Sequence, residues 1–425
     1  MNNQRTGLLA ATVLTVLAAP AARAIDVTAG AWTLSFDGNV NANYIYSTCN
    51  DHNDVAGGLA CVSDTTSDNS SAVSNGLLPA ALTVSGATTQ DGMNLGFTFG
   101  LYPGISTNDG GSPNLQSIAN TDLGHTALGT AGLDVRQVFL TAGGSWGTIM
   151  AGRNIGLFGA DAILNDMTLL GVGGGNGSYA APANTSLGSI GLGYIYTDWL
   201  SQINYTTPDM GGAKVTVGIF DPLNTLGQVP ANHSTPGIQA KVAYTVGSLY
   251  LSASGLYQQQ RVLCSDLAAG ACAAGSVAGS YVSYGSTAID LGGKYDIAGF
   301  EVAGWYYHGS GVGTTGLFVN SNDAMGSSRK SDGFLGQVTY KIQNTKVGIN
   351  YGVSNLDGTA LDRSTFCGGV VGCLVKRNDK WSLGLYQNVT ANLLFVTEFS
   401  RLQSKNDAGQ TNSSWNINAG LFLKF

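Results

Sequence analysis

The last eleven residues, Trp415 to Phe425, read WNINAGLFLKF and alternate between two kinds of side chain. The apolar set is Trp415, Ile417, Ala419, Leu421, Leu423 and Phe425. The residues between them are mostly polar or small: Asn416, Asn418, Gly420, Phe422 and Lys424. Successive side chains of a β-strand point to opposite faces, so this segment predicts a strand with one apolar face and one polar face. Its length suits a strand that crosses a membrane at a tilt.

The composition also favours a membrane protein made of strands. The chain of 425 residues is 44% hydrophobic but only 11% charged, with 61 glycines and 9 prolines. Soluble domains carry about 25% charged residues, so a soluble enzyme is disfavoured, and the hydrophobic content excludes disorder. Beyond residue 24, no run approaches the roughly 18 consecutive apolar residues that a spanning helix needs.

Residues 1–24 have the features of a secretory signal peptide. Arg5 precedes an apolar stretch, and the small-residue pattern Ala22-Arg23-Ala24 predicts cleavage after Ala24. Without Arg5 and Arg23, 17 of the 19 Lys+Arg remain against 26 Asp+Glu, so the mature chain from Ile25 has a formal charge of −9. This acidic balance argues against nucleic acid as a partner.

The two-residue alternation recurs along residues 25–425, which we predict form one barrel. It is clear over the following segments: Trp32 to Tyr46, Met93 to Tyr102, Ala213 to Phe220, Ile238 to Thr245, Leu249 to Gln258, Phe334 to Lys341 and Lys346 to Ser354. Short links rich in turn-forming residues lie between pairs of strands: Thr89 to Gly92, Gly143 to Gly147, Pro208 to Gly212, Val246 to Ser248, Asp296 to Gly299, Gln343 to Asn344 and Gln387 to Thr390. Long links separate them.

Short and long links in strict succession are typical of outer-membrane barrels. Seven short turns and eight long loops predict about sixteen antiparallel strands in an all-β transmembrane barrel, with both termini at the short-turn end. An even number of strands closes the sheet, which leaves no unpaired edge in hydrocarbon. A soluble β-sandwich is the alternative, but it would need more Lys and Glu on its polar face.

The six cysteines form three close sequence pairs in polar loop segments. The pairs are Cys49 with Cys61, Cys264 with Cys272, and Cys367 with Cys373. We expect three local disulfides, although sequence alone allows 15 connectivities for six cysteines. The four histidines are scattered, so neither a metal site nor another cofactor site is expected.

Two sequence patterns resemble enzyme motifs but predict no catalysis. Residues 143–147 satisfy G-x-S-x-G, yet a nucleophile elbow requires a strand followed by a helix, whereas here we expect strands on both sides of a tight turn. The glycine-rich run Gly171 to Gly177 is not placed as a phosphate-binding loop. We interpret that run as a flexible loop segment.

Residues 134–154 read DVRQVFLTAGGSWGTIMAGRN, and this segment resembles the strand-turn-strand of Gram-negative general porins. In those porins an Arg-Gln-x-Phe strand precedes a Gly-containing turn and a Gly-Arg ending. The aromatic C-terminus, Phe425, also resembles theirs and is identified as the signal for the outer-membrane assembly machinery. The resemblance implies a sixteen-stranded barrel, a homotrimer and a third external loop folded into the lumen.

The predicted third loop, residues 155–193, follows the fifth strand and contains two charged residues, Asp161 and Asp166. By this resemblance, acidic loop residues face basic residues of the wall across a constriction and set an ion preference. Asp161 and Asp166 are the acidic candidates; Arg136, Arg153 and Lys214 are the basic ones. The alternatives remain open: Asp166 as a helix cap, Arg153 as a strand-end anchor, and Arg136 as the partner of Asp134.

The sequence therefore predicts an outer-membrane porin that lets small hydrophilic solutes and ions diffuse passively. The net charge favours a mild preference for cations. Lipid and lipopolysaccharide are expected around the barrel, with the long loops outside the cell and the termini in the periplasm. A substrate-selective channel is the first alternative, followed by a barrel enzyme and by an adhesin or phage receptor.

Overall fold

The structure is a computed structural model that describes residues 25–61, 69–105, 133–175, 185–224, 232–268, 270–272, 279–365 and 373–425. The predicted signal peptide, residues 1–24, lies outside the described residues. The strands are β1 (Ile25–Ala29), β2 (Trp32–Ser47), β3 (Val55–Ala56), β4 (Ser70–Ser74), β5 (Ala81–Gln90), β6 (Met93–Pro103), β7 (Leu133–Gly144), β8 (Gly147–Ile155), β9 (Trp199–Thr206), β10 (Ala213–Phe220), β11 (Gly237–Val246), β12 (Leu249–Leu263), β13 (Tyr281–Ile297), β14 (Phe300–Ser310), β15 (Lys330–Ile342), β16 (Thr345–Asp357), β17 (Cys373–Asn388), β18 (Leu393–Asn406) and β19 (Thr411–Lys424). Within these described ranges, four short helical segments lie between strands: α1 (Ala160–Leu164), η2 (Met167–Leu170), η4 (Cys264–Asp266) and α2 (Ala360–Thr365).

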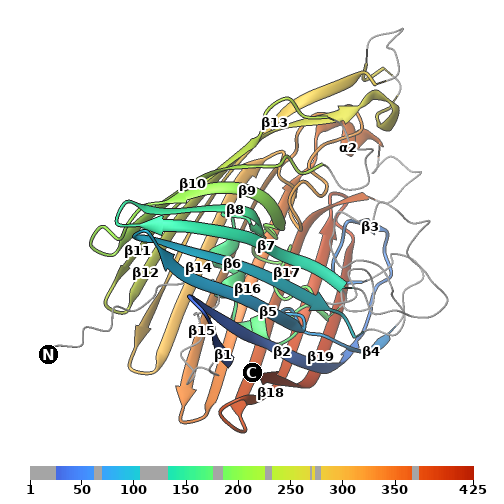
Figure 1. Cartoon of the computed structure of the whole chain (residues 1–425). Coiled ribbons are helices and arrows are strands. Elements are labelled where there is room, and N and C mark those ends of the chain that lie inside the picture. Colours follow the sequence, from blue (N-terminus) through green and yellow to red (C-terminus); the bar gives the residue numbers. More distant parts are fainter. Residues whose placement is uncertain are drawn as a thin grey trace, which may run out of the picture.

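Sixteen strands, β2 and the fifteen from β5 to β19, form one closed antiparallel barrel (Figure 1). Each pairs with its sequence neighbour, and β19 closes the sheet by pairing with β2. The backbone of Phe425 extends this seam through two 3.1 Å hydrogen bonds with Gly38. The predicted fold class and strand number are confirmed. Closure satisfies the backbone groups that an open edge would expose to hydrocarbon.

All seven short links predicted from the sequence are turns between adjacent barrel strands. The strand between two turns is often longer than its pattern suggested: β15 extends from Lys330 to Ile342, and β12 continues to Leu263. One expectation was wrong, because the last connection at the long-loop end, residues 407–410, is a four-residue link between β18 and β19. The short strand β1, which pairs with β2, was not predicted.

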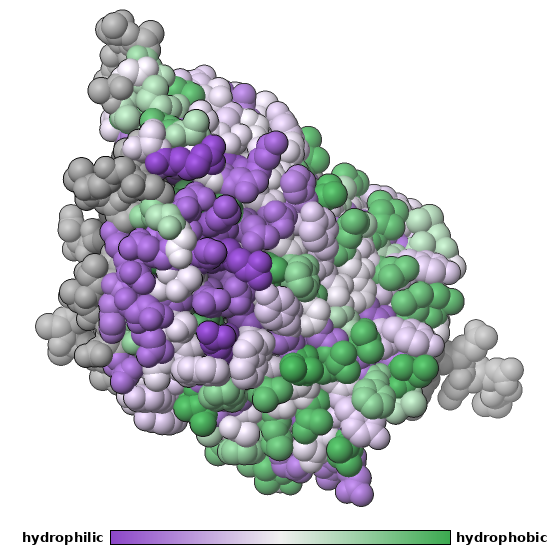
Figure 2. All heavy atoms as spheres, turned by 180° about the vertical axis from the view of Figure 1, so that it is seen from behind, coloured by the Kyte–Doolittle hydropathy of each residue, from purple (hydrophilic) through white to green (hydrophobic). Residues whose placement is uncertain are grey.

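Side chains alternate across the barrel wall as the C-terminal pattern predicts. On β19, Ile417 and Leu421 are about half exposed on the outer face, at 51% and 50%, whereas Asn416 and Asn418 are buried on the inner face. Apolar side chains gather over the barrel body, and polar ones toward the long-loop end (Figure 2). The wall therefore presents hydrocarbon-compatible residues outward and encloses a polar lumen. Within the described ranges, no helix is long and apolar enough to span a membrane.

Candidate functional site: the lumen and loop 3

The long connection between β8 and β9, residues 156–198, is called loop 3 here; the structure describes its residues 156–175 and 185–198. Gly159, with a left-handed φ of 73°, precedes the short helix α1. Asp166 caps the next segment, η2, by accepting a 2.9 Å hydrogen bond from the backbone N–H of Thr168. These two local signals fold the first half of loop 3 into compact helical turns instead of an extended chain.

Polar side chains of the far wall hold loop 3. On β15, Gln337 accepts a 2.9 Å hydrogen bond from the N–H of Met167 and donates a 2.6 Å bond to the carbonyl of Asn165. On β18, the buried Glu398 accepts bonds of 2.8 and 2.7 Å from the N–H groups of Val172 and Gly173. Because β15 and β18 are far from β8 around the barrel, loop 3 contacts the inner face of a distant wall.

Glu398 is the most heavily bonded of these anchors. Besides the two N–H groups of loop 3, it accepts a 2.6 Å bond from the hydroxyl of Tyr386 and a 3.1 Å bond from the amide of Asn418. Four donors around one buried carboxylate compensate its loss of hydration. The residue thereby fixes the glycine-rich part of loop 3 to the wall.

Glycines allow the loop backbone to touch the wall. A Cβ at Gly352 of β16 would lie 1.9 Å from the carbonyl oxygen of Leu192, and a Cβ at Gly171 would lie 2.1 Å from Glu398 Oε1. The N–H of Gly174 donates a 2.8 Å hydrogen bond to Gly188. In the described part of the glycine-rich run, residues 171–175, the glycines permit this close approach.

Two other loops meet loop 3 inside the barrel. In the loop between β2 and β5 (loop 1, residues 48–80), the N–H groups of Leu59 and Ala60 donate to Ser404 of β18, at 2.8 and 2.9 Å. In the loop between β14 and β15 (loop 6, residues 311–329), the carbonyl of Thr315 accepts a 2.7 Å bond from the N–H of Tyr196. Gly191 of loop 3 lies against both Leu59 and Thr315. Loops 1, 3 and 6 are thus in contact with one another.

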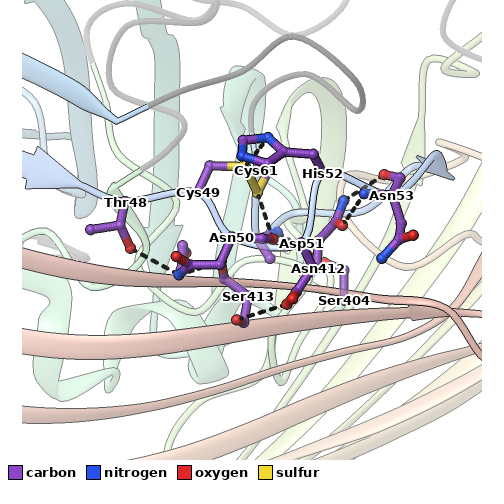
Figure 3. Close-up of a disulfide and its surroundings, with 12 residues drawn as sticks. Thr48, Cys49, Asn50, Asp51, His52, Asn53, Cys61, Ser404, Asn412 and Ser413 are labelled. Carbon is purple, nitrogen blue, oxygen red and sulfur yellow. Dashed lines mark hydrogen bonds between the residues drawn. A yellow bond between two sulfur atoms is a disulfide. The ribbon is translucent and has the colours of Figure 1, made fainter.

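Two of the three predicted disulfides lie within the described residues, and both are confirmed. Cys49 pairs with Cys61 in loop 1 (Figure 3), and Cys264 pairs with Cys272 in the loop between β12 and β13. The side chain of Asn412, on β19, accepts a 2.7 Å bond from the N–H of Asn53, which ties the loop beside the first disulfide to the barrel rim. The third predicted pair includes Cys367, which lies outside the described residues.

Both predicted acidic residues of loop 3 are buried and engaged. Asp161 accepts a 3.2 Å hydrogen bond from the ammonium of Lys241, an inward-facing residue of β11. Asp166 caps η2 and accepts a 2.9 Å bond from the hydroxyl of Tyr194. Burial, together with the neighbouring Asp166 carboxylate, raises the pKa of Tyr194 well above its usual value. The structure therefore gives Asp166 the capping role that remained open from the sequence.

The three predicted basic residues lie in different places. Arg136, buried at a β-bulge opposite β6, makes a 2.8 Å ion pair with Asp134 and lies 5.0 Å from the ring centroid of Tyr102. Arg153 pairs across the sheet with Val138, which is 38% exposed on the outer face, so Arg153 also belongs to that face. Lys214 lines a cavity on the inner side of the wall. The structure does not bring these three together opposite Asp161 and Asp166.

The sequence interpretation missed the main basic residues of the lumen. Lys241, Lys341, Lys346 and Lys424 line two cavities at the short-turn end, of about 390 and 370 Å³. Each lysine lies on the inner face of its strand, so the alternation could have identified it once the inner face of that strand was fixed. A further inward lysine, Lys380 on β17, is fully buried.

Asp198 ends loop 3 just before β9 and is 3% exposed. Burial raises the pKa of its carboxyl group to about 6, although the 2.7 Å hydrogen bond from the N–H of Trp199 and the charge of Arg153 act in the opposite direction. Its backbone is left-handed, with a φ of 63°. The described residues contain no group of three or more His, Cys, Asp or Glu side chains that could hold a metal ion.

The sequence model of the Gram-negative porin family matches residues 10–408. The protein therefore belongs to the Gram-negative porin family. A comparison with curated proteins found no match. Family and barrel together define a channel of the outer membrane, a class whose members are not enzymes.

Several solved porin structures share the fold at low sequence identity. The outer membrane channel DcaP of Acinetobacter baumannii has a TM-score of 0.66 and 13% identity, over 95% of this chain and 100% of that chain. The anion-selective porin from Comamonas acidovorans has a TM-score of 0.59 and 17% identity, over 93% and 100%. The trimer form of OmpT from Vibrio cholerae has a TM-score of 0.53 and 14% identity, over 93% and 100%. At these identities the similarity concerns the fold.

Proposed function

We propose that this protein is a passive porin in which loop 3 forms the constriction that decides which hydrophilic solutes pass. The observation that carries this proposal is the set of hydrogen bonds joining loop 3 to Gln337 and Glu398 on the far wall. A loop that starts on one wall of the barrel and is bonded to the opposite wall reduces the free cross-section of the lumen. Solutes are then selected by size and charge.

The ion preference depends on the charges that line the remaining space. The net charge of the chain favours cations, but Asp161 is paired with Lys241 and Asp166 is buried as a cap. At the short-turn end, Lys341, Lys346 and Lys424 line the lumen, and no ion pair to them exists among the described residues. We therefore propose a mild preference for anions, with the cation preference expected from net charge as the alternative.

Single-channel recording in a planar bilayer under a KCl gradient tests both statements. Long-lived steps establish an open porin, and the sign of the reversal potential separates anion from cation preference. Replacing the three lysines together by glutamine is expected to move the reversal potential toward cations. A reversal potential that stays unchanged in this variant contradicts the assignment, and absence of steps from a correctly folded barrel contradicts the porin.

The remaining features are proposed from the family relationship. Residues 1–24 are removed on export, the long loops face the outside, and both termini lie in the periplasm. The barrel forms a homotrimer in a bilayer of lipid and lipopolysaccharide, after the assembly machinery has recognised Phe425. One of the solved relatives, OmpT of Vibrio cholerae, is described in a trimer form. Channel steps that close in threes support the trimer.

A further inference from the structure

A cavity of about 370 Å³ lies in the short-turn half of the lumen, between loop 3 and the wall formed by β13 to β19. Its two sides differ in chemistry. The wall side carries three lysines, Lys341, Lys346 and Lys424, and the loop side carries three leucines, Leu164, Leu169 and Leu170. All three leucines retain partial exposure. The cavity therefore has a cationic side and an apolar side.

The three lysines have no carboxylate within ion-pair distance among the described residues. Lys341 of β15 and Lys346 of β16 are directly opposite each other across the sheet, which places like charges at adjacent positions. Like charges in this arrangement repel, so an anion between them is stabilising. Within the described part of the chain, no ion pair includes Lys341, Lys346 or Lys424. Lys346 lies 5.2 Å from the ring centroid of Tyr386, a cation–π contact that is weaker than a direct ion pair.

Three acidic residues border the same cavity, and two of them, Glu301 and Asp166, are engaged with other partners. Glu301 lies 3.8 Å from the ammonium of Lys294, with which it forms an ion pair. Asp166 is 3% exposed and engaged as the η2 cap. Asp296 is exposed at the end of β13, beside the turn to β14. The positive side of the cavity thus remains available to a solute.

The leucines make the chemistry of this cavity different from that of a site for fully hydrated ions. An acidic loop opposite basic wall residues would create a transverse field across the passage, whereas Leu164, Leu169 and Leu170 offer no charge to a solute. Covering the partly exposed leucines with an apolar group is instead favourable, by about 25 cal/mol per Å² of apolar surface removed from water. A solute with one anionic end and a short apolar body satisfies both sides together.

We propose that this cavity is a binding subsite for amphipathic organic anions, such as monocarboxylates with a short hydrocarbon chain. The carboxylate lies between Lys341, Lys346 and Lys424, and the chain covers the leucines of loop 3. This inference rests on the proposed porin function, because it names a solute class for the same lumen. It distinguishes the protein from a porin that selects by charge and size alone.

Four probes of matched design test the site. Hexanoate carries both features, acetate the charge alone, hexanol the chain alone, and hexylammonium the chain with the opposite charge. Each is titrated against the KCl current of single channels and, separately, against detergent-solubilised protein by calorimetry. We expect hexanoate to reduce the current at concentrations at least tenfold below those of acetate, and the other two probes to bind more weakly than hexanoate.

Variants separate the two halves of the site. Lys346→Gln with Lys424→Gln is expected to weaken hexanoate binding at least tenfold, whereas Lys405→Gln, an exposed lysine near the long-loop end of β18, leaves it unchanged. Leu164→Gln with Leu170→Gln should remove the advantage of hexanoate over acetate while the acetate titration stays as in the original protein. The heat-induced mobility shift of the folded barrel on gels confirms folding of each variant.

The two proposals fail in distinguishable ways. Equal affinities for hexanoate and acetate in a conducting channel would overturn the subsite and leave the porin standing. A loss of affinity in the Lys405→Gln control as large as in the double-lysine variant would also overturn the subsite. Calorimetric binding of hexanoate by a barrel that shows no channel steps would support the subsite and contradict the porin.

Discussion

Single residues at the ends of loop 3 combine burial with charge, and Asp198 is the clearest case. The residue needs a left-handed backbone and an acceptor for the N–H of Trp199. Asparagine satisfies both requirements without a charge, because it tolerates positive φ and its side-chain oxygen accepts the same bond. The carboxylate of Asp198 therefore costs stability that an amide would not.

Asp198→Asn is expected to stabilise the protein in a pH-dependent way. Because burial raises the folded-state pKa of Asp198 to about 6, the folded state binds a proton more tightly than the unfolded chain, whose carboxyl titrates near 4. The stability of the original protein then falls as the pH rises from about 4 to 6. Urea unfolding in micelles should give the variant an advantage of about 3 kcal/mol at pH 8 and none below pH 4. An equal advantage at both pH values would contradict the shifted pKa.

At the scale of elements, loop 3 is held both by apolar packing against the wall and by hydrogen bonds from its backbone to wall side chains. Glu398 receives four donors, two of which are N–H groups of Val172 and Gly173. A carboxylate can only accept, whereas glutamine brings an NH₂ group that needs acceptors of its own. The anchor therefore depends on the charge state of one side chain.

Glu398→Gln is expected to loosen loop 3 and widen the passage. The change breaks charge-assisted bonds that contribute about 1.5–3 kcal/mol each, so a loss of several kcal/mol in anchoring follows. Liposome swelling should show faster entry of disaccharides, with little change for monosaccharides. Asp379→Asn serves as control, because Asp379 on the adjacent strand β17 pairs with Arg377 at a partly exposed position. Unchanged disaccharide entry would mean that Glu398 does not hold the constriction.

Removal of each of the two described disulfides is expected to affect conductance differently. Cys49–Cys61 fixes loop 1, whose Leu59 and Ala60 bond to Ser404 inside the barrel, whereas Cys264–Cys272 fixes the loop between β12 and β13. Each disulfide stabilises the folded conformation of its loop by about 2–3 kcal/mol. Replacing Cys49 and Cys61 by alanine should raise conductance and its noise, and replacing Cys264 and Cys272 should not. Identical traces for both double variants would contradict a role for loop 1 in the lumen.

At the scale of the whole molecule, closure decides whether the barrel exists. The seam joins β19 to β2, and Phe425 extends it through its two backbone bonds to Gly38. A Cβ at Gly38 would lie 2.9 Å from the Phe425 ring, so the last side chain packs against the seam. By contrast, β1 pairs only with Trp32 to Phe36 of β2, a part of that strand that β19 does not reach.

Removing Phe425 and removing β1 should therefore have unequal consequences. Deletion of Phe425 is expected to reduce the folded barrel in the outer membrane severalfold, since it removes both the seam extension and the proposed recognition residue. Deletion of Ile25 to Ala29 should leave the amount of folded barrel nearly unchanged. Heat-modifiable mobility on gels measures both. Equal loss in the two variants would show that β1 is needed for closure.

Much of the architecture was determined by local sequence alone. The two-residue alternation of β19 and β2, together with turn-forming residues at seven links, predicts which residues face lipid and where the chain reverses. These features follow from the geometry of one strand and one turn, so no distant contact is needed to predict them. Cys49 and Cys264 could be matched to their partners because the partners lie close in sequence.

Only the tertiary structure decided the composition of the lumen. Asp161 meets Lys241, and Glu398 meets Val172, because barrel closure brings residues 80 and 226 positions apart into contact. Which inward lysines remain without ion pairs depends on where loops 1, 3 and 6 lie, and an alternating pattern contains no information about loop placement. Arg153 illustrates the same limit, since the register of β8 against β7 puts it on the outer face. The strand pattern thus determines the wall, whereas long-range packing of the loops determines the passage.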